Sequence, residues 1–500
     1  MAVGLTGETF ADPALKTISA AIIKNLVNFI LMTLMLDYKD NLKIAIKFIN
    51  PSNKITFGFF ATFGILFKKM ALLKDQDNQV LIGETKMQEQ KLEELLQYIS
   101  QHSPFYKELF AKSGIDISAI KSIADLALIP TTSKEDLQKR NNDFLCVPAD
   151  KIIEYTSTSG TLGSPVTIAL TESDLNRLAY NEYNSFLCAD GSKDDIYQLM
   201  LTLDRQFMAG IAYYSGIRKL GAGIIRLGPG VPALQWETIR RLKPTAIVAV
   251  PSFILKLISF AKETGIDINS TSVKKAICIG ENIRNTDFSL NMLGKKITES
   301  WNIKLYSTYA STEMQTAFTE CGEGKGGHYQ PELVIVELLD ENDQPVKPYT
   351  PGEVTITTLG VEGMPLLRYK TGDICMQFDE PCACGRATLR LSSIMGRKKQ
   401  MIKFKGTTLY PPALFDLLNE REEIVDYVVE VYANEIGLDQ VLLHILPTED
   451  SEECDHRIRA YLQARLRVSP LIKYVSAEEL HKIQFNEASR KPIKFIDRRL

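Results

Sequence analysis

The middle of the sequence alternates short β-rich runs with helical stretches, and this alternation restricts the fold more than any other feature. The runs TAIVAV (245–250) and KAICIG (275–280) are almost entirely apolar, without the polar positions of a strand that has one solvated face. Between them, FILKLISFAKETG (253–265) is typical of a helix. Strands buried on both faces and separated by helices indicate a sheet between helical layers. The sequence therefore predicts an α/β fold.

The organisation changes on both sides of this region. After residue 395 the pattern restarts on a smaller scale, with PPALFDLLNE and HRIRAYLQARL as helices and DYVVEVYA and QVLLHILP as strands. Upstream, ETKMQEQKLEELLQYISQ (84–101) predicts a helix with one apolar face. We expect an apolar N-terminal extension over 1–75, a large multi-layer domain over 76–395 and a small α+β domain over 396–500.

Charge and cysteine content argue against two classes of protein. Lys and Arg number 58 against 61 Asp and Glu, so the formal charge of -3 gives no electrostatic footprint for a nucleic-acid partner. Eight cysteines among 500 residues are too sparse for the disulfide framework of a secreted protein. The first twelve residues lack the basic side chains of a secretory signal. We expect a cytoplasmic protein in a reducing compartment.

Two apolar runs in the extension allow several interpretations. Residues 17–36 contain a single charge, Lys24, and residues 55–67 contain none, whereas a spanning helix needs about 20 apolar residues. The pattern favours an amphipathic helix buried against protein, with interfacial anchoring and a spanning hairpin as alternatives. Because phenylalanines crowd the second run and lysines lie between the two runs, we hypothesise that residues 1–75 dock on a membrane or a partner protein.

The segment EYTSTSGTLGSPVTI (154–168) has the composition of a phosphate-binding loop. Gly160 and Gly163 allow the backbone to approach a ligand, and five Ser and Thr residues around them supply hydroxyl groups and exposed amides. The segment lacks the Gly-Lys-Ser/Thr sequence of a Walker A loop. Taken alone, a segment of this composition is more often a plain turn.

Further motifs in a fixed order change that interpretation. The loop resembles the TSGTTGxP signature of the adenylate-forming superfamily, and the similarity is closest to phenylacetate-coenzyme A ligases and their relatives. This resemblance covers about residue 90 to the end and implies a large multi-layer N-terminal domain with a small mobile α+β C-terminal lid. The other matching segments are YASTE (309–313), RYKTGD (368–373), CACGR (382–386), GRKKQMIKFKG (396–406) and RKPIKFIDRR (490–499).

The resemblance implies where the phosphates of ATP are bound. Ser159, Gly160 and Thr161, with Gly163 in the same loop, are expected to hold the β- and γ-phosphates. Thr312 would contact the α-phosphate. Glu313 would ligate Mg²⁺, which prefers carboxylate and phosphate oxygens. Leu162, Val166 and Ala310 depart from the pattern of the relatives, and the first two remove phosphate contacts.

The resemblance also assigns the nucleoside. Gly280 and Glu281 are expected to line the adenine slot, with Tyr309 stacking on the base. Asp373 would accept hydrogen bonds from both ribose hydroxyls, with Arg397 nearby.

Two lysines are implied to act through the lid. Lys491 is expected to enter the site during adenylation, although Arg490 and Pro492 differ from the usual Gly and Ala, and Lys494 is an alternative. Lys399 is expected to be the hinge about which the lid rotates between adenylation and thioester formation.

Four dispersed residues raise the question of a metal. Cys321 and His328 have the spacing C-x6-H, and Cys382 and Cys384 have C-x-C. These ligand types suit a tetrahedral structural zinc, and zinc at corresponding cysteines occurs in some relatives. The alternative is that reduced cysteines pack as small apolar side chains.

The sequence therefore predicts an ATP-dependent acid:thiol ligase that forms an acyl-adenylate and then a thioester. Coenzyme A and an aryl or arylacetic acid are the expected partners, and a homodimer is common among the relatives. One alternative is adenylation that delivers the acyl or adenylyl group to a carrier protein or a cofactor. Another is a nucleotide-binding, membrane-associated partner protein without catalysis.

Overall fold

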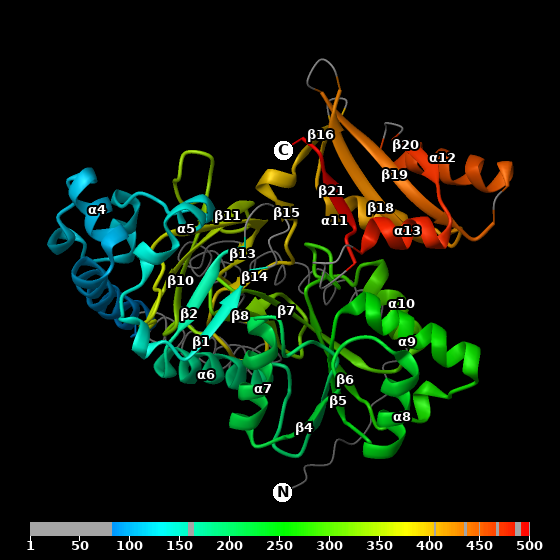
Figure 1. Ribbon diagram of the computed structural model, residues 1–500, viewed down its shortest axis with the longest axis horizontal. Coiled ribbons are helices and arrows are strands. Elements are labelled where there is room, and N and C mark those ends of the chain that lie inside the picture. Colours follow the sequence, from blue (N-terminus) through cyan, green and yellow to red (C-terminus); the bar gives the residue numbers. More distant parts are fainter. Residues whose placement is uncertain are drawn as a thin grey trace, which may run out of the picture. The chain divides into compact units, whose positions relative to one another are not determined.

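The computed structural model describes residues 83–158, 165–404, 407–434, 438–449, 451–466, 470–485 and 492–499, with only the backbone at 407 and 408. The chain divides into two units, Met1–Gln76 and Asp77–Leu500, and the described residues, which are coloured in Figure 1, belong to the second. The extension over 1–75 therefore lies outside the described residues. Within the described part, no helix is long and apolar enough to cross a membrane.

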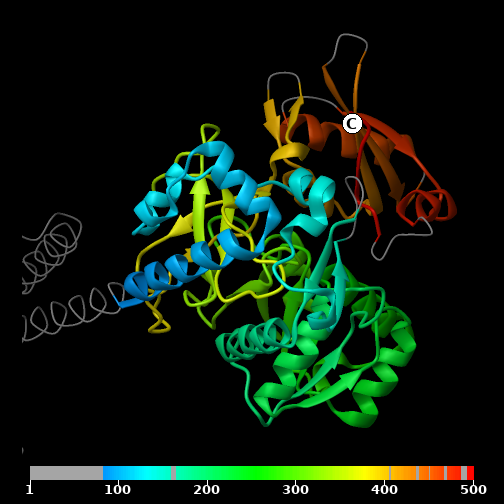
Figure 2. The ribbon, with the colours of Figure 1, turned by 60° about the vertical axis from the view of Figure 1, so that its left-hand side comes forward.

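The first described helix spans residues 83–102 and confirms the prediction made for 84–101. Its apolar stripe, including Leu92, Leu96 and Ile99, is fully buried in a core shared with the β10–β12 sheet described below (Figure 2). Two helices follow, α4 (Pro104–Ser113) and, after two short 3-10 helices, α5 (Lys134–Arg140).

The largest sheet contains nine described strands in the order β13-β14-β9-β8-β7-β6-β5-β3-β4. Strands β4, β3, β5, β6 and β7 are parallel, and the pairs from β7 to β13 are antiparallel. The YASTE segment (309–313) begins on β7 of this sheet and continues into the turn after it. Their bounds are β3 (Ile196–Leu199), β4 (Gly223–Arg226), β5 (Ala246–Ala249), β6 (Lys275–Ile279), β7 (Lys304–Ser311), β8 (Thr316–Glu320), β9 (Gly327–His328), β13 (Gln377–Phe378) and β14 (Arg390–Leu391).

Helices cover both faces of the parallel strands. Successive residues of a strand point to opposite faces, so Ile247 packs in one apolar core and its neighbour Val248 in another. This explains the nearly continuous apolar composition of these runs. The helices are α6 (Glu172–Cys188) and α7 (Met208–Leu220) on one face, and α8 (Pro232–Leu242), α9 (Pro251–Thr264) and α10 (Met292–Ser300) on the other.

A second sheet supplies the other wall of the site. It has the order β10-β11-β12-β15, with all neighbours antiparallel. A separate hairpin of β1 and β2 flanks residues 159–164, which contain the expected phosphate loop and lie outside the described residues. The bounds are β1 (Glu154–Ser157), β2 (Thr167–Leu170), β10 (Val334–Leu339), β11 (Gly352–Thr358), β12 (Tyr369–Cys375) and β15 (Gly396–Arg397).

The C-terminal region, which we call the lid, is an α+β fold with its own apolar core (Figure 1). Its sheet has the order β20-β19-β18-β21, in which only the central pair is antiparallel. The predicted strands and helices are present as β18, β19, α11 and α12. The elements are β16 (Ile402–Phe404), β17 (Thr407–Leu409), α11 (Pro411–Asn419), β18 (Ile424–Ala433), β19 (Asp439–Pro447), α12 (Glu452–Leu466), β20 (Leu471–Tyr474), α13 (Ala477–Gln484) and β21 (Phe495–Asp497).

Candidate active site

Three residues that are far apart in the sequence meet at the end of β12. Asp373 lies opposite Arg397 in the β12–β15 ladder, and Arg397 Nε donates to Asp373 Oδ1 over 3.0 Å. From β7, the Tyr309 hydroxyl donates to the other carboxylate oxygen, Oδ2, over 2.8 Å. The Asp373 side chain is only 8% exposed, whereas Arg397 is 48% exposed. The structure therefore brings together the three residues expected to bind the ribose and the base.

The electrostatics of this cluster hold its donors in the protonated form. The attraction of Asp373 raises the pKa of Arg397 above its usual value. Burial, and then the charge of Asp373, raise the pKa of Tyr309 well above its usual value. Each Asp373 oxygen accepts one of these hydrogen bonds and retains a further lone pair. A pair of hydroxyl groups can therefore bind this carboxylate without displacing Tyr309 or Arg397.

The ring of Tyr309 is also positioned by aromatic packing. It stacks on Phe318 of β8, with the ring centroids 5.8 Å apart and the planes inclined by 29°. Phe318 is buried, and Tyr309 is half-buried. Packing and the bond to Asp373 thus fix the orientation of the ring, and its stacking on adenine stays a prediction.

Glu313 lies in the turn that connects β7 to β8 and is almost fully buried. The Tyr369 hydroxyl donates to its Oε1 atom over 3.4 Å, and Lys134 Nζ lies 4.0 Å from the same oxygen. Thr312, the preceding residue, is partly exposed. The charge of Glu313 also contributes to raising the pKa of Arg397. Glu313, the expected metal ligand, and Asp373, the expected ribose acceptor, therefore both act on Arg397.

Lys134 and Tyr369 were not identified from the sequence as site residues. Lys134 is the first residue of α5, which begins at a capping box between Ser133 and Asp136. The sequence SKED carries that signal for a helix start, but it does not indicate that the helix begins beside Glu313. Tyr369 lies inside the RYKTGD motif.

The start of α5 is joined to both β12 and the expected hinge. Backbone hydrogen bonds connect Thr132 to β12 on both sides, from Thr132 N to Arg368 O and from Lys370 N to Thr132 O, each 2.9 Å. Glu135, next to Lys134, forms an ion pair with Lys399. The first turn of α5 therefore reaches the expected metal ligand with one residue and the expected hinge residue with the next.

Gly280 and Glu281 follow β6 at the carboxyl edge of the parallel strands, where ligands of such sheets bind. Gly280 has φ +74°, in the left-handed region that favours glycine. The Glu281 carboxylate accepts from Ser252 N–H (2.8 Å) and from its hydroxyl (2.9 Å), in the first turn of α9. A carboxylate at a helix N-terminus is stabilised there, so Glu281 also has a structural partner.

Several expected site residues lie outside the described residues. These are Ser159, Gly160, Thr161 and Gly163 of the phosphate loop, and Lys491 of the lid.

The alternative lysine, Lys494, is described. Its ammonium forms an ion pair with Asp426 and lies 4.5 Å from the ring centroid of Tyr427, both on β18. Lys494 is thus bound within the lid.

The two pairs of soft ligands form one cluster. The ligand atoms of Cys321, His328, Cys382 and Cys384 all lie within 4.8 Å of one another. The Cys321 and Cys382 sulfurs are 3.6 Å apart, and Cys384 Sγ lies 3.5 Å from His328 Nε2. The other ring nitrogen, Nδ1, is 2.8 Å from Thr388 Oγ1, an arrangement that fixes ring orientation in metal sites. The donor set and its spacing fit one tetrahedral zinc.

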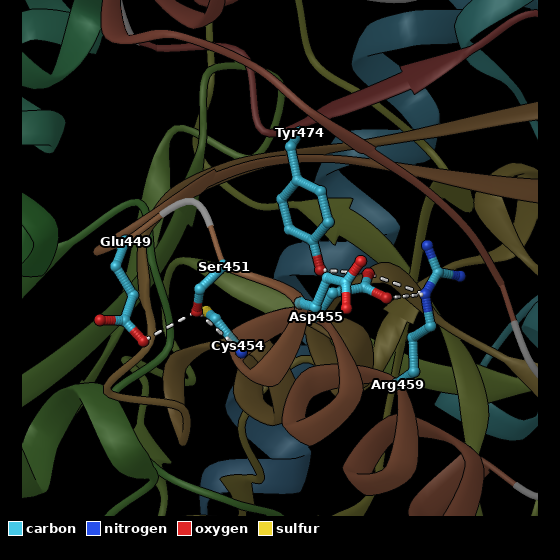
Figure 3. Close-up of a pocket in the computed structure, with 7 residues that line it drawn as sticks. Glu449, Ser451, Cys454, Asp455, Arg459 and Tyr474 are labelled. Atoms are coloured by element: carbon cyan, nitrogen blue, oxygen red, sulfur yellow. Dashed lines mark hydrogen bonds and ion pairs between the residues drawn. The ribbon is translucent and has the colours of Figure 1, made fainter.

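A hollow of about 330 Å³ lies in the lid beside α12 (Figure 3). Its polar groups bind one another: Asp455 accepts from Tyr474 Oη and from Arg459 Nε, each over 2.8 Å, and Ser451 Oγ donates to Glu449 over 3.0 Å. None of the expected site residues lines it, so it is not the active site.

The family follows from comparison with known proteins. A model of the family described as AMP-binding enzyme matches residues 71–363, more than half of the chain. The chain belongs to this family. This AMP-binding enzyme is 27% identical to a phenylacetate-coenzyme A ligase of Thermus thermophilus, over 77% of this chain and 89% of the relative. It is 26% identical to the phenylacetate-coenzyme A ligase of Escherichia coli, over 76% and 86% of the two chains. These findings confirm the resemblance predicted from the motifs.

A solved structure confirms the fold class of this AMP-binding enzyme. A 2-hydroxyisobutyryl-CoA ligase in the postadenylation state, bound to an acyl-adenylate, superposes with a TM-score of 0.72. The alignment covers 82% of this chain and 89% of that chain, at 21% sequence identity. The α/β domain followed by a small α+β domain is therefore the fold that the sequence predicted.

Proposed function

We propose that this AMP-binding enzyme is an AMP-forming acid:coenzyme A ligase. One observation carries the proposal: a buried carboxylate, Asp373, is held by Tyr309 and Arg397 beside a second buried carboxylate, Glu313. A diol acceptor next to a carboxylate suited to Mg²⁺ is the arrangement that a ribonucleoside triphosphate requires. The relatives named phenylacetate-coenzyme A ligase support an acid and coenzyme A as the other two substrates.

The reaction has two steps. First, a carboxylate oxygen of the acid attacks the α-phosphorus of ATP, so that an acyl-adenylate forms and pyrophosphate leaves. Second, the sulfur of coenzyme A attacks the acyl carbonyl and the thiol proton is released, while AMP leaves with the electron pair of the broken bond between the acyl carbon and the phosphate oxygen. Bound Mg²⁺ would neutralise phosphate charge. Asp373 would hold the ribose through both steps, and Glu313 would hold the metal.

A panel of acids tests this proposal. Purified enzyme with ATP and Mg²⁺ is expected to release pyrophosphate with phenylacetate or a related aryl acid, and to form AMP and a thioester once coenzyme A is added. Pyrophosphate exchange without thioester formation would favour delivery to a carrier protein or cofactor instead. AMP binding without acid-dependent pyrophosphate release for any aryl or fatty acid would refute the ligase.

We further propose that Cys321, His328, Cys382 and Cys384 bind one structural zinc, because four protein ligands leave no open position for catalysis. Chelator-washed protein is expected to contain about one zinc per chain by elemental analysis. The Cys382→Ser/Cys384→Ser variant should lose both zinc and thermal stability. Cys188→Ser is the matched control, because Cys188 packs beside the cluster but is not one of its four ligands. Wild-type protein without zinc would contradict the proposal.

For the extension over 1–75 we propose docking to the cytoplasmic face of a membrane or to a partner protein, supported by its apolar and lysine-rich sequence. A chain lacking these residues is expected to stop sedimenting with anionic liposomes or with the partner, while it keeps acid-dependent pyrophosphate release. Loss of adenylation in the truncated protein would show instead that the extension belongs to the catalytic fold. We also propose a homodimer, which is tested by the mass of the purified protein in solution.

A further inference from the structure

The guanidinium of Arg499 is bound to the hinge at the other end of the lid sequence. Arg499 Nη1 donates to Met401 O over 2.8 Å, and Nη2 donates to Lys399 O over 3.4 Å. The Arg499 side chain is 16% exposed. An arginine that follows the last strand of the lid therefore binds two main-chain carbonyls about a hundred residues earlier, on either side of Gln400.

Two carboxylates fix this guanidinium in place. Asp497 accepts from Nε over 2.9 Å and from Nη2 over 2.6 Å, with one oxygen for each. Asp439, at the start of β19, accepts from Nη1 over 2.9 Å and from the Lys403 N–H over 2.6 Å. This planar fork is fully engaged, which a lysine could not reproduce. Arg499 thus links β21, β19 and the hinge in one network.

The strand that carries Arg499 is part of the lid core. β21 pairs in parallel with β18, with Val429 opposite Phe495 and Val431 opposite Asp497. Arg498 N also donates to Val431 O over 2.7 Å. The carbonyls at Lys399 and Met401 are therefore tied, through Arg499, to the central strands of the lid sheet.

The side chains of Lys398 and Lys399, in contrast, bind residues of the large domain. Lys398 Nζ donates to Glu353 of β11 over 2.9 Å. Lys399 forms its ion pair with Glu135 of α5. Lys399 is consequently held by the large domain through its side chain and by the lid through its carbonyl. The backbone of Lys399 therefore lies between the two sets of contacts.

We propose that Arg499 is a positioning residue that fixes the lid side of the hinge, so that the lid turns as one body about the backbone of Lys399. The proposal rests on the two-step ligase described above, in which the lid must take two orientations. Without Arg499, the lid keeps its own core but loses the hydrogen bonds that fix its orientation relative to the backbone of Lys399 and Met401. Both steps then slow, because each needs the lid in a specific pose.

Hydrogen exchange tests this role without knowledge of the acid. The variants are Arg499→Ala and Arg499→Lys, with Arg498→Ala as the matched control, because Arg498 is 62% exposed and pairs with Glu430 away from the hinge. In Arg499→Ala, amide exchange in a peptide spanning 398–404 is expected to rise about tenfold or more, while exchange in β18 and β19 stays near that of the control. Arg499→Lys should give an intermediate rise.

Kinetics supply the second readout. Pyrophosphate release with phenylacetate, and thioester formation from supplied phenylacetyl-adenylate, should both fall about tenfold in kcat, with KM for ATP changed by less than about threefold. Unchanged exchange over 398–404 in both Arg499 variants would overturn the proposal. Faster exchange throughout β18 and β19 would also overturn it, because that result describes a residue that only stabilises the lid. If wild-type enzyme releases no pyrophosphate with any acid, the ligase proposal fails, and the exchange result alone decides the role of Arg499.

Discussion

Asp373 illustrates how a single buried charge can be held ready for a ligand. Its two partners, Tyr309 and Arg397, come from strands of different sheets, so the carboxylate joins the two walls of the site. Neither partner can lose its proton near neutral pH, because the pKa of each is raised. The two donors therefore orient the carboxylate before a ligand arrives, which would reduce the cost of binding a ribose.

Replacing Asp373 should weaken nucleotide binding. Hydrogen bonds to a charged acceptor are worth about 1.5 to 3 kcal/mol each, so Asp373→Ala is expected to raise the Kd for AMP by at least about tenfold in calorimetry. Asp194→Ala, in an exposed loop, is the control. Equal affinities for AMP in the two variants would remove Asp373 from the nucleotide site.

Lys134 should act on the phosphates rather than on the nucleoside. Its ammonium lies 4.0 Å from Glu313 Oε1, the expected metal ligand, and the described contacts include no hydrogen bond or ion pair between Lys134 and Asp373. We expect Lys134→Ala to weaken binding of MgATP by about tenfold while AMP affinity changes by less than about twofold, measured by calorimetry. Lys139→Ala, on the exposed face of the same helix, should change neither value. An equal loss for AMP and MgATP would contradict this assignment.

Among the helices and strands, the sequence predicted those whose own residues carry a clear apolar pattern. β5 and β6 are apolar because both faces are covered, and the helix over 83–102 has a regular apolar stripe. The short strands β20 and β21 were not predicted, because they contain three or four residues and lie at the two edges of the lid sheet. Their pairing depends on long-range contacts that no local period records.

The same limit applies to the site. Asp373, Arg397 and Tyr309 were predicted because motifs mark them, and the structure shows their mutual contacts. Lys134 was missed because its neighbours in sequence indicate only a helix start, and its position beside Glu313 depends on the pairing of Thr132 with β12. The role of Arg499 likewise depends on contacts between the two ends of the lid.

A buried carboxyl group on α6 is expected to make the stability of the folded protein depend on pH. Glu182 on α6 is fully buried, and desolvation raises its pKa to about 8. Its Oε2 atom has no hydrogen-bond partner among the described residues. Since the folded protein holds this proton more tightly than the unfolded chain, the stabilisation is complete below about pH 4.5 and is lost as pH rises towards 8, by up to about 1.4 kcal/mol per pH unit.

Glu182→Gln should remove this dependence because the amide is nearly isosteric and does not ionise. Thermal unfolding at pH 5, 7 and 8.5 is expected to show that the variant gains stability relative to wild type as pH rises. The nearby Glu172→Gln, in the exposed first turn of α6, is the control and should follow wild type. A wild-type-minus-variant difference that does not vary with pH would show that Glu182 does not titrate on unfolding.

At the scale of the whole molecule, the catalytic cycle is expected to divide its work between a fixed nucleotide site and a moving lid. The described contacts of the fixed site come from α5, β7, the turn after β7, β12 and β15, all of which precede the expected hinge residue, Lys399. The lid has its own folded core, and it carries Lys491, which is expected to enter the site. A lid residue that enters the site should therefore affect one chemical step, and a residue that holds the structure or orientation of the lid should affect both. A residue of the fixed site should affect nucleotide binding throughout.

Lys491 and Lys494 are expected to differ in which of the two chemical steps they affect. Lys494 is engaged by Asp426 and Tyr427 inside the lid, so Lys494→Ala is expected to lower the thermal stability of the lid and to slow both steps to a similar degree.

Lys491→Ala should depress adenylation by orders of magnitude, because a cation near the leaving phosphates stabilises the charge that develops there. Thioester formation from supplied acyl-adenylate should be largely retained. The measurement is the rate of each step, followed by pyrophosphate release and by thiol consumption, beside a thermal melt of each variant. If Lys494→Ala loses adenylation alone and melts like wild type, then Lys494 is the catalytic cation and the lid must release it from Asp426 in each cycle.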